Sequence, residues 1–186
     1  MTSLFADPKV YIGANYGVYN EVFFNEIDTE VKTNTQRIKV GYGIRDFYAL
    51  ELSLEYTKNQ ENIFSSEDNN DGDKLSFNVE LLKAFDLDIY VIPFLKAGFG
   101  FGNLSIKQQG TDIYGDTKEI KRLSFGNFNL GVGTFIPINE HLDFEIGYEY
   151  KFLAYENFDT ATTTENNGPA FKSHVNIGYI GINIRF

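Results

Sequence analysis

The sequence predicts an all-β fold: an eight-stranded antiparallel up-and-down transmembrane β-barrel, with its apolar face toward lipid and a polar, charged and filled lumen. Three observations lead to this prediction. Apolar residues recur at every second position in eight segments, which is the period of a strand and not of a helix. The connections between these segments alternate between short and long. The polar face of the segments combines charged residues with glycines.

Four strands are predicted in the first half of the chain, at residues 9–19, 37–45, 48–57 and 74–81. In each of them aliphatic and aromatic residues fall on one parity. Small, polar or charged residues fall mainly on the other parity. Such alternation is typical of a strand that separates an apolar from a polar environment.

Four further strands are predicted at residues 89–102, 125–136, 142–152 and 173–186. Pro93 has no N–H donor, so we expect it near a strand end or at a bulge. In the last segment, Val175 and Ile177 fall on the parity opposite to the later isoleucines, and a β-bulge is one interpretation of this change.

The connections suggest how these strands are arranged. Three are short, at residues 46–47, 85–88 and 137–141, and four are long and polar, at residues 20–36, 58–73, 103–124 and 154–172. Because short and long connections alternate, all the long ones lie at one end of a meander. The chain has 186 residues, and we expect a single barrel over residues 9–186.

The polar face carries charges of both signs, with glycines between them. In a narrow barrel, glycines make room for long charged side chains, whereas on a solvated outer face they would have no such role. Buried charges must pair, so we predict a lumen charge network, with its pairings left open, of Arg37, Lys39, Glu51, Glu55, Lys96, Glu145, Glu149, Lys151 and Arg185. The same face also carries Arg45, Lys74, Glu80 and Asp143. The network either only fixes the barrel or lines a narrow, gated ion path.

The apolar face extends over roughly 9–11 residues per strand, the length that crosses a bilayer at a tilt. Tyrosines on this face suit the boundary between lipid and water.

Composition excludes several classes of function. The chain has 26 acidic and 16 basic residues, a formal net charge of −10, no Cys and two His. A strongly basic nucleic-acid binder, a disulfide framework and a thiolate metal site are therefore excluded, and we expect no cofactor. Residues 1–8 are either the remnant of a secretory signal peptide or an ordinary N-terminal tail.

The end of the chain carries a resemblance to a known family. Alternating hydrophobic residues end on an aromatic residue, with Ile180, Ile182, Ile184 and Phe186 on one face. This pattern looks like the closing strand of Gram-negative outer-membrane β-barrels, and residues 93–100 resemble a strand of small opacity-protein, OmpA-like and OmpX-like barrels. The resemblance implies an integral protein of the bacterial outer membrane and a terminal assembly signal read by the outer-membrane assembly machinery. It also implies contact with outer-membrane lipid and lipopolysaccharide, and a monomer.

On this basis we expect a non-enzymatic outer-membrane protein that contributes to envelope integrity or to surface interaction, with a possible host or surface ligand at its long acidic loops. A small-diameter, porin-like channel is the alternative, and a lipid-modifying enzyme is the second. The resemblance to lipid A deacylases would require His-x-Ser on one strand face, but His174 is followed by Val175-Asn176, and Ser173 points to the opposite face. His141 lies in a short turn with no serine nearby. The acidic segment 67–73 does not fit a calcium loop, because Asn78 stands where a bidentate Glu is required.

Overall fold

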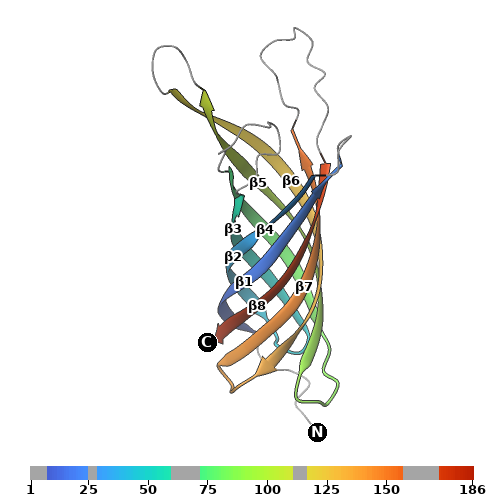
Figure 1. Cartoon of the computed structure of the whole chain (residues 1–186). Helices are drawn as coiled ribbons and strands as arrows, with labels where there is room; N and C mark the ends of the chain where they lie inside the picture. The colour runs from blue at the N-terminus through green and yellow to red at the C-terminus, as the bar shows by residue number, and fades with distance from the viewer. Residues whose placement is uncertain (1–7, 25–28, 60–71, 111–116, 157–171) are drawn as a thin grey trace.

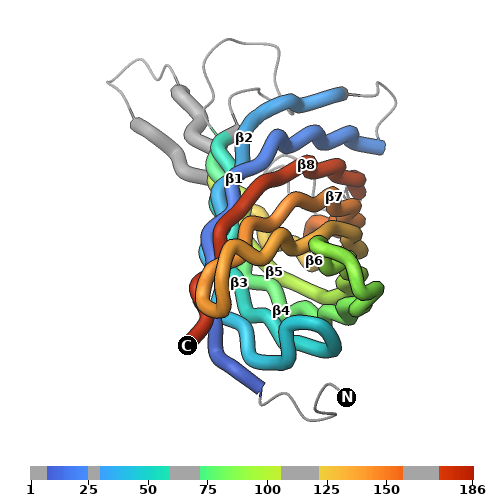
Figure 2. Tube along the Cα trace, turned by 90° about the horizontal axis from the view of Figure 1, so that it is seen from below, coloured from blue at the N-terminus to red at the C-terminus, as the bar shows by residue number. Residues whose placement is uncertain are grey.

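The computed structural model describes residues 8–24, 29–59, 72–110, 117–156 and 172–186. Its eight strands are β1 (Lys9–Phe23), β2 (Thr29–Gly43), β3 (Tyr48–Asn59), β4 (Gly72–Ala84), β5 (Ile92–Gly110), β6 (Thr117–Pro137), β7 (Leu142–Tyr155) and β8 (Lys172–Arg185). Each strand pairs antiparallel with its neighbours, and β8 pairs with β1, so the sheet closes into a barrel (Figures 1 and 2). The predicted fold class is therefore confirmed.

The two ends of the barrel differ. Residues 44–47, 85–91 and 138–141 form the short connections at one end, which we call the turn end. At the opposite loop end, the described strands extend well past the closed part of the barrel, and the β5–β6 ribbon reaches furthest (Figure 1). The start of β1 and the end of β8 both lie at the turn end, where Tyr11 pairs with Arg185.

Apolar side chains face outward along the middle of the barrel. Ile38, Leu52, Leu130 and Ile182 are all exposed, whereas the charged residues between the apolar positions are buried in the lumen. This is the reverse of a soluble barrel, and it follows from the period-two alternation once lipid replaces water outside. Among the described residues there is no helix long and apolar enough to cross a bilayer.

The strands are longer at the loop end than the sequence predicted. β1 continues to Phe23 and β2 begins at Thr29, so much of the predicted long connection 20–36 is strand. β5 and β6 likewise extend into the predicted connection 103–124. The reason is that the polarity of the two faces reverses there: Phe23 and Val31 are buried inside, while Lys32 is exposed outside. A strand predicted from its outward apolar residues therefore ends where the outward residues become polar.

The same reversal explains the first part of β8, which precedes its outward-facing isoleucines. β8 pairs with β7 and β1 in continuous register, so there is no bulge at Val175 and Ile177. Both side chains point into the lumen, where they join an apolar cluster. Pro93 is the second residue of β5, near a strand end as expected, although this strand begins at Ile92 and not at residue 89.

Two glycines on the inner face lie where a large side chain of a neighbouring strand packs against the inner surface of the barrel. A Cβ added to Gly131 would lie 2.7 Å from Cγ and from Cε of Lys96. One added to Gly147 would lie 2.4 Å from the ring of Tyr179 on the neighbouring strand. These positions therefore make room for one long cation and one aromatic ring.

Candidate functional site

The centre of the lumen is occupied by the guanidinium of Arg37 on β2. Its Nη1 and Nη2 donate to the two carboxylate oxygens of Glu149, at 2.8 and 2.7 Å, and its Nε donates to Glu55 at 2.9 Å. Lys96 Nζ lies 2.7 Å from Glu149, and Lys151 Nζ lies 2.7 Å from Glu55. The five side chains are almost completely buried and come from four strands, β2, β3, β5 and β7, so the bidentate pair joins opposite walls of the barrel.

A second layer lies closer to the turn end. Lys39 Nζ donates to Glu51 at 2.9 Å and to Glu145 at 2.6 Å. The hydroxyl of Tyr11 also donates to Glu51, at 2.5 Å. At the turn end, Arg185 Nε donates to Asp143 at 2.6 Å.

The structure thus brings all nine residues of the predicted lumen network into the interior, in a set of ion pairs. It also adds partners that the network did not include. Among the described residues, the ion pairs of the lumen use seven cationic and seven acidic residues, the additional ones being Glu21, Lys74, Glu80, Asp143 and the partly exposed turn residue Arg45. Four of these lie on the predicted polar face, so parity alone could have included them. Glu21 lies in a segment predicted to be a loop, and the signal that could have indicated its burial is the parity that it shares with Tyr19 and Phe23.

Apolar layers close the lumen on both sides of the charges. At the loop end, a buried cluster comprises Tyr19, Phe23, Val31, Leu104, Leu123, Phe125, Leu153, Tyr155, Val175, Ile177 and Tyr179. At the turn end, a smaller cluster comprises Tyr11, Ala49, Leu82, Ala84, Phe94 and Phe135. We call these the loop-end plug and the turn-end plug.

One charge pair is buried within the loop-end plug. Glu21 is fully buried and forms an ion pair with Lys74, which lies 5.4 Å from the ring centre of Phe23. The hydroxyls of Tyr155 and Ser173 donate to the same carboxylate at 2.7 and 2.6 Å. The carboxylate therefore has polar partners for both of its oxygens.

Little free space is left in the lumen between the plugs. In the described part of the chain, the lumen contains a cavity of about 10 Å³, bordered by Glu55, Lys74 and Lys151. A volume of this size holds at most one water molecule. In this part of the described lumen, side chains therefore occupy almost all of the space between the plugs.

The residues considered for catalysis do not come together. Ser173 is buried in the lumen and bonded to Glu21. His174 lies on the outer face, where its ring is 5.0 Å from that of Phe24 and 6.0 Å from that of Tyr150. His141 lies in a turn, and its N–H donates to the side chain of Asn139. Within the described residues, this arrangement gives no serine activated by a histidine.

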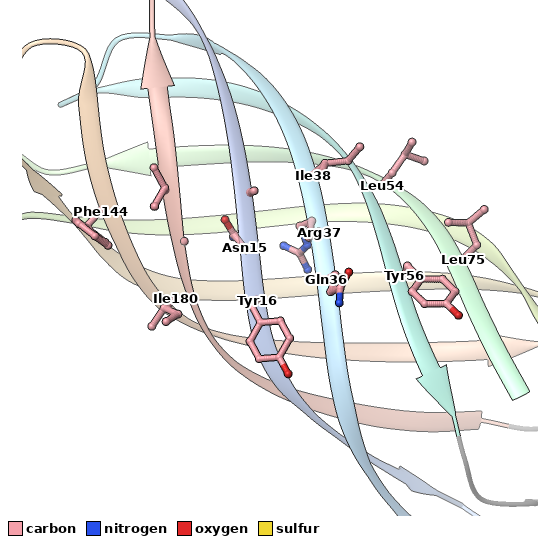
Figure 3. Close-up of a pocket in the computed structure, with 13 residues that line it drawn as sticks. Asn15, Tyr16, Gln36, Arg37, Ile38, Leu54, Tyr56, Leu75, Phe144 and Ile180 are labelled. Atoms are coloured by element: carbon pink, nitrogen blue, oxygen red, sulfur yellow. The ribbon is translucent and has the colours of Figure 1, made fainter. Parts of the chain in front are cut away.

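Two shallow hollows mark the apolar outer wall. The first, of about 640 Å³, lies across β8, β1, β2 and β3 and reaches Phe144 on β7 and Leu75 on β4. Figure 3 shows Tyr16 and Tyr56 along it and Ile38 beside Leu54, whereas Arg37 belongs to the inner face. The second, of about 580 Å³, lies across β4, β5, β6 and β7 around Ala97.

The residues of the expected assembly signal lie on one outer face of the last strand. Ile180, Ile182 and Ile184 are exposed to the lipid side, and Phe186 is exposed beyond the end of β8. The Phe186 N–H donates to the Val10 carbonyl at 3.0 Å. The segments 1–7 and 157–171, and most of the acidic segment 67–73, lie outside the described residues.

These features define a class of protein: a closed eight-stranded barrel with an apolar exterior and a charged, plugged interior. Residues 5–179 match the family described as outer membrane protein beta-barrel domain, and the chain belongs to this family. It is an integral protein of the outer membrane. The turn end is therefore periplasmic and the loop end extracellular, as the short periplasmic turns of such barrels require.

Particular solved structures share the fold. The chain is 17% identical to Neisserial surface protein A, with a TM-score of 0.67, and the match covers 97% of this chain and 100% of that one. It is 16% identical to Ail, the attachment invasion locus protein of Yersinia pestis, with a TM-score of 0.57 over 97% of this chain and 100% of that one. For the outer membrane protein OprG of Pseudomonas aeruginosa the identity is 12% and the TM-score 0.54, over 97% and 96%. A search of curated protein sequences gives no match.

Proposed function

We propose that this chain is a non-enzymatic, monomeric outer-membrane barrel that conducts no ions and contributes to envelope integrity and surface interaction through its extracellular part. The observation that carries the proposal is the closure of the lumen. Ion-paired charges fill its centre, and apolar plugs cover the charges on both sides. A barrel of eight strands has an interior only wide enough for side chains, and here they occupy it.

The extracellular part supports a role at the surface. β5 pairs with β4 only as far as Ile106, but with β6 as far as Gly110. The β5–β6 ribbon therefore projects beyond the wall of the barrel (Figure 1). Strands that continue beyond the bilayer do not serve membrane crossing, so the projecting part of this ribbon is available for contacts at the cell surface.

Charge narrows the kind of surface partner. The formal net charge is −10, so long-range electrostatics disfavour polyanions and favour cationic or neutral partners. One solved structure of Ail, with a TM-score of 0.52 and 17% identity, is a complex with the heparin analogue sucrose octasulfate. We expect weaker binding of such a sulfated ligand by this chain.

Conductance tests the closed lumen. The chain is refolded in detergent, and a gel of unboiled and boiled samples verifies the barrel by its heat-dependent mobility. Planar bilayers containing the folded fraction should show no current steps above the lipid baseline. Regular steps that scale with salt concentration would establish the porin-like alternative.

Cell assays test the surface role. Cells expressing the full chain are compared with cells expressing a variant whose residues 157–171 are replaced by a Gly/Ser linker of equal length. We expect the full chain to increase attachment to host cells or resistance to bile salts, and the variant to lose part of that gain. Unchanged attachment and resistance in both strains would contradict the proposal, and a change in lipid A mass caused by the full chain would favour an enzyme.

A further inference from the structure

The hollow around Ala97 arises from one small side chain in an apolar wall. Ala97 pairs in register with Leu81 on one side and Leu130 on the other. Leu95, Val132, Tyr148 and Tyr150 also line it from the outer face, and Lys96 and Gly131 border it from the inner face. Because alanine replaces the larger residue found at neighbouring outward positions, the wall has a recess of about 580 Å³ that opens to the lipid side.

Lys83 is the outward cation at the periplasmic end of this recess, whereas Lys96 borders it only from inside, where it is buried and paired with Glu149. Lys83 is the second-to-last residue of β4, and it pairs in register with Tyr48 and Leu95. Its Nζ lies 3.7 Å from the ring centre of Phe47 and 4.2 Å from that of Tyr48. Among the described residues, Lys83 forms no ion pair with a carboxylate, although most lysines of the lumen do.

The position of this ammonium group fixes which ligand chemistry it can meet. Aromatic faces hold it in place at the boundary of the bilayer without neutralising its charge. The groups available at that depth are the phosphates of membrane lipids. An ammonium in partly apolar surroundings binds phosphate more strongly than one in bulk water.

We propose that this recess binds one glycerophospholipid of the periplasmic leaflet, with its phosphate on Lys83 and one acyl chain along Ala97. Two observations argue for this occupant. The recess is continuous with the apolar band that already contacts lipid, and the unneutralised charge at its end complements a phosphate. The proposal requires only that the barrel spans the membrane, and it does not depend on a surface role.

The other hollow of the outer wall provides an internal control. It has a similar volume, about 640 Å³, and likewise includes an alanine, Ala14. Its outward polar groups are those of Tyr16, Gln36 and Tyr56 (Figure 3), so they are neutral. The cation Arg37 borders it only from inside, where it is buried and bonded to Glu55 and Glu149. A site that depends on phosphate should therefore exist around Ala97 and not around Ala14.

The test counts lipids that remain on the folded barrel. The full chain is refolded in detergent and titrated with phosphatidylglycerol, or with diacylglycerol of the same acyl chains, and native mass spectrometry measures the bound lipid. Wild type should retain one phosphatidylglycerol, and should bind diacylglycerol about tenfold more weakly, because one charge-assisted contact is lost. Equal retention of both lipids would overturn the role of the phosphate.

Variants locate the site on the wall. Lys83→Gln removes the charge, Ala97→Leu fills the recess, and Ala14→Leu fills the other hollow as the matched control. The first two should each weaken phosphatidylglycerol retention about tenfold, and Ala14→Leu should leave it unchanged. Unchanged retention in Lys83→Gln, or an equal loss in Ala14→Leu, would overturn the proposal. Heat-dependent gel mobility verifies folding, and Lys83→Gln alone decides if Ala97→Leu does not fold.

Discussion

The centre of the lumen and its two plugs are built from the same inward positions but by different chemistry. In the centre, carboxylates and cations meet across the barrel, as Arg37 and Glu149 do. In the plugs, aromatic and aliphatic side chains meet instead, and Glu21–Lys74 is the ion pair buried in the loop-end plug. Buried ion pairs contribute little net stability, because desolvation offsets their attraction, whereas apolar burial contributes directly.

The comparison shows that the two regions depend on each other. The plugs exclude water from the central charges, which strengthens each ion pair and raises the cost of leaving one partner alone. The charges in turn fix which strand faces which across the lumen. We expect the plugs to affect stability through their buried apolar volume, and the centre to affect it through the balance of its buried positive and negative charges.

The largest effect is expected from Glu149→Gln. This carboxylate is paired with Arg37, Lys96 and Lys151, so its neutralisation leaves an excess of buried positive charge. We expect a loss of about 3–5 kcal/mol in the free energy of unfolding. Urea titration in lipid vesicles, read by gel mobility, measures it. Glu140→Gln, in an exposed turn, is the control, and an equal effect of the two variants would contradict the central role of charge balance.

A somewhat smaller effect is expected in the loop-end plug. Leu104→Ala removes buried volume there and should cost about 2–4 kcal/mol. The lipid-facing Leu130→Ala makes the same chemical change outside and should cost less, because lipid can fill the space. Neither variant should conduct in planar bilayers, since the charged centre remains filled. Current steps in Leu104→Ala would show that the plug alone closes the barrel.

The Glu21–Lys74 ion pair tests whether a charge pair stabilises the apolar loop-end plug. Lys74→Met alone leaves Glu21 buried without its cation and should be clearly destabilising. The double variant Glu21→Gln/Lys74→Met removes both charges, and it should lie within about 1 kcal/mol of wild type, or be more stable. A double variant as unstable as the single one would mean that the ion pair itself stabilises the plug.

The smallest effect is expected for an exposed carboxylate beyond the bilayer. Hydrogen bonds from Lys32 and from Asn20 lower the pKa of Glu30 below its ordinary value. The contribution of these bonds to the free energy of unfolding is present above the ordinary carboxylate pKa, and it is lost as the pH falls through the lowered pKa of the folded state. In Lys32→Ala, NMR titration should show the pKa of Glu30 raised toward the ordinary value, with unfolding scarcely changed. An unshifted pKa would mean that Lys32 is not the cause.

The sequence predicts the membrane-spanning part of the barrel well. Alternation in segments such as 48–57 persists because lipid outside and charge inside impose opposite requirements on successive residues. Strand number, direction and the inward position of the network residues all follow from this pattern. The particular partners do not follow, because the match of Arg37 to Glu149 depends on how β2 and β7 face each other across the closed barrel.

The extracellular part is predicted less well. There the outward side chains meet water and the inward ones form a plug, so parity reverses within a single strand, as between Ile177 and Ile180. A method that follows one apolar face reads this reversal as a loop or a bulge. Searching both parities in each segment would have placed Val175 and Phe23 inside.

The pairing of β1 with β8 has a consequence for how the barrel is made. Every other pairing joins strands that are neighbours along the chain. The β1–β8 pairing, which we call the seam, joins the first strand to the last, for example at Tyr11 and Arg185. Until the seam forms, the sheet has two open edges, whose unpaired backbone groups cannot be placed in hydrocarbon. Insertion therefore cannot be completed strand by strand. We expect biogenesis to wait at a single late step, and mutations along the seam to slow assembly more than they weaken the finished barrel.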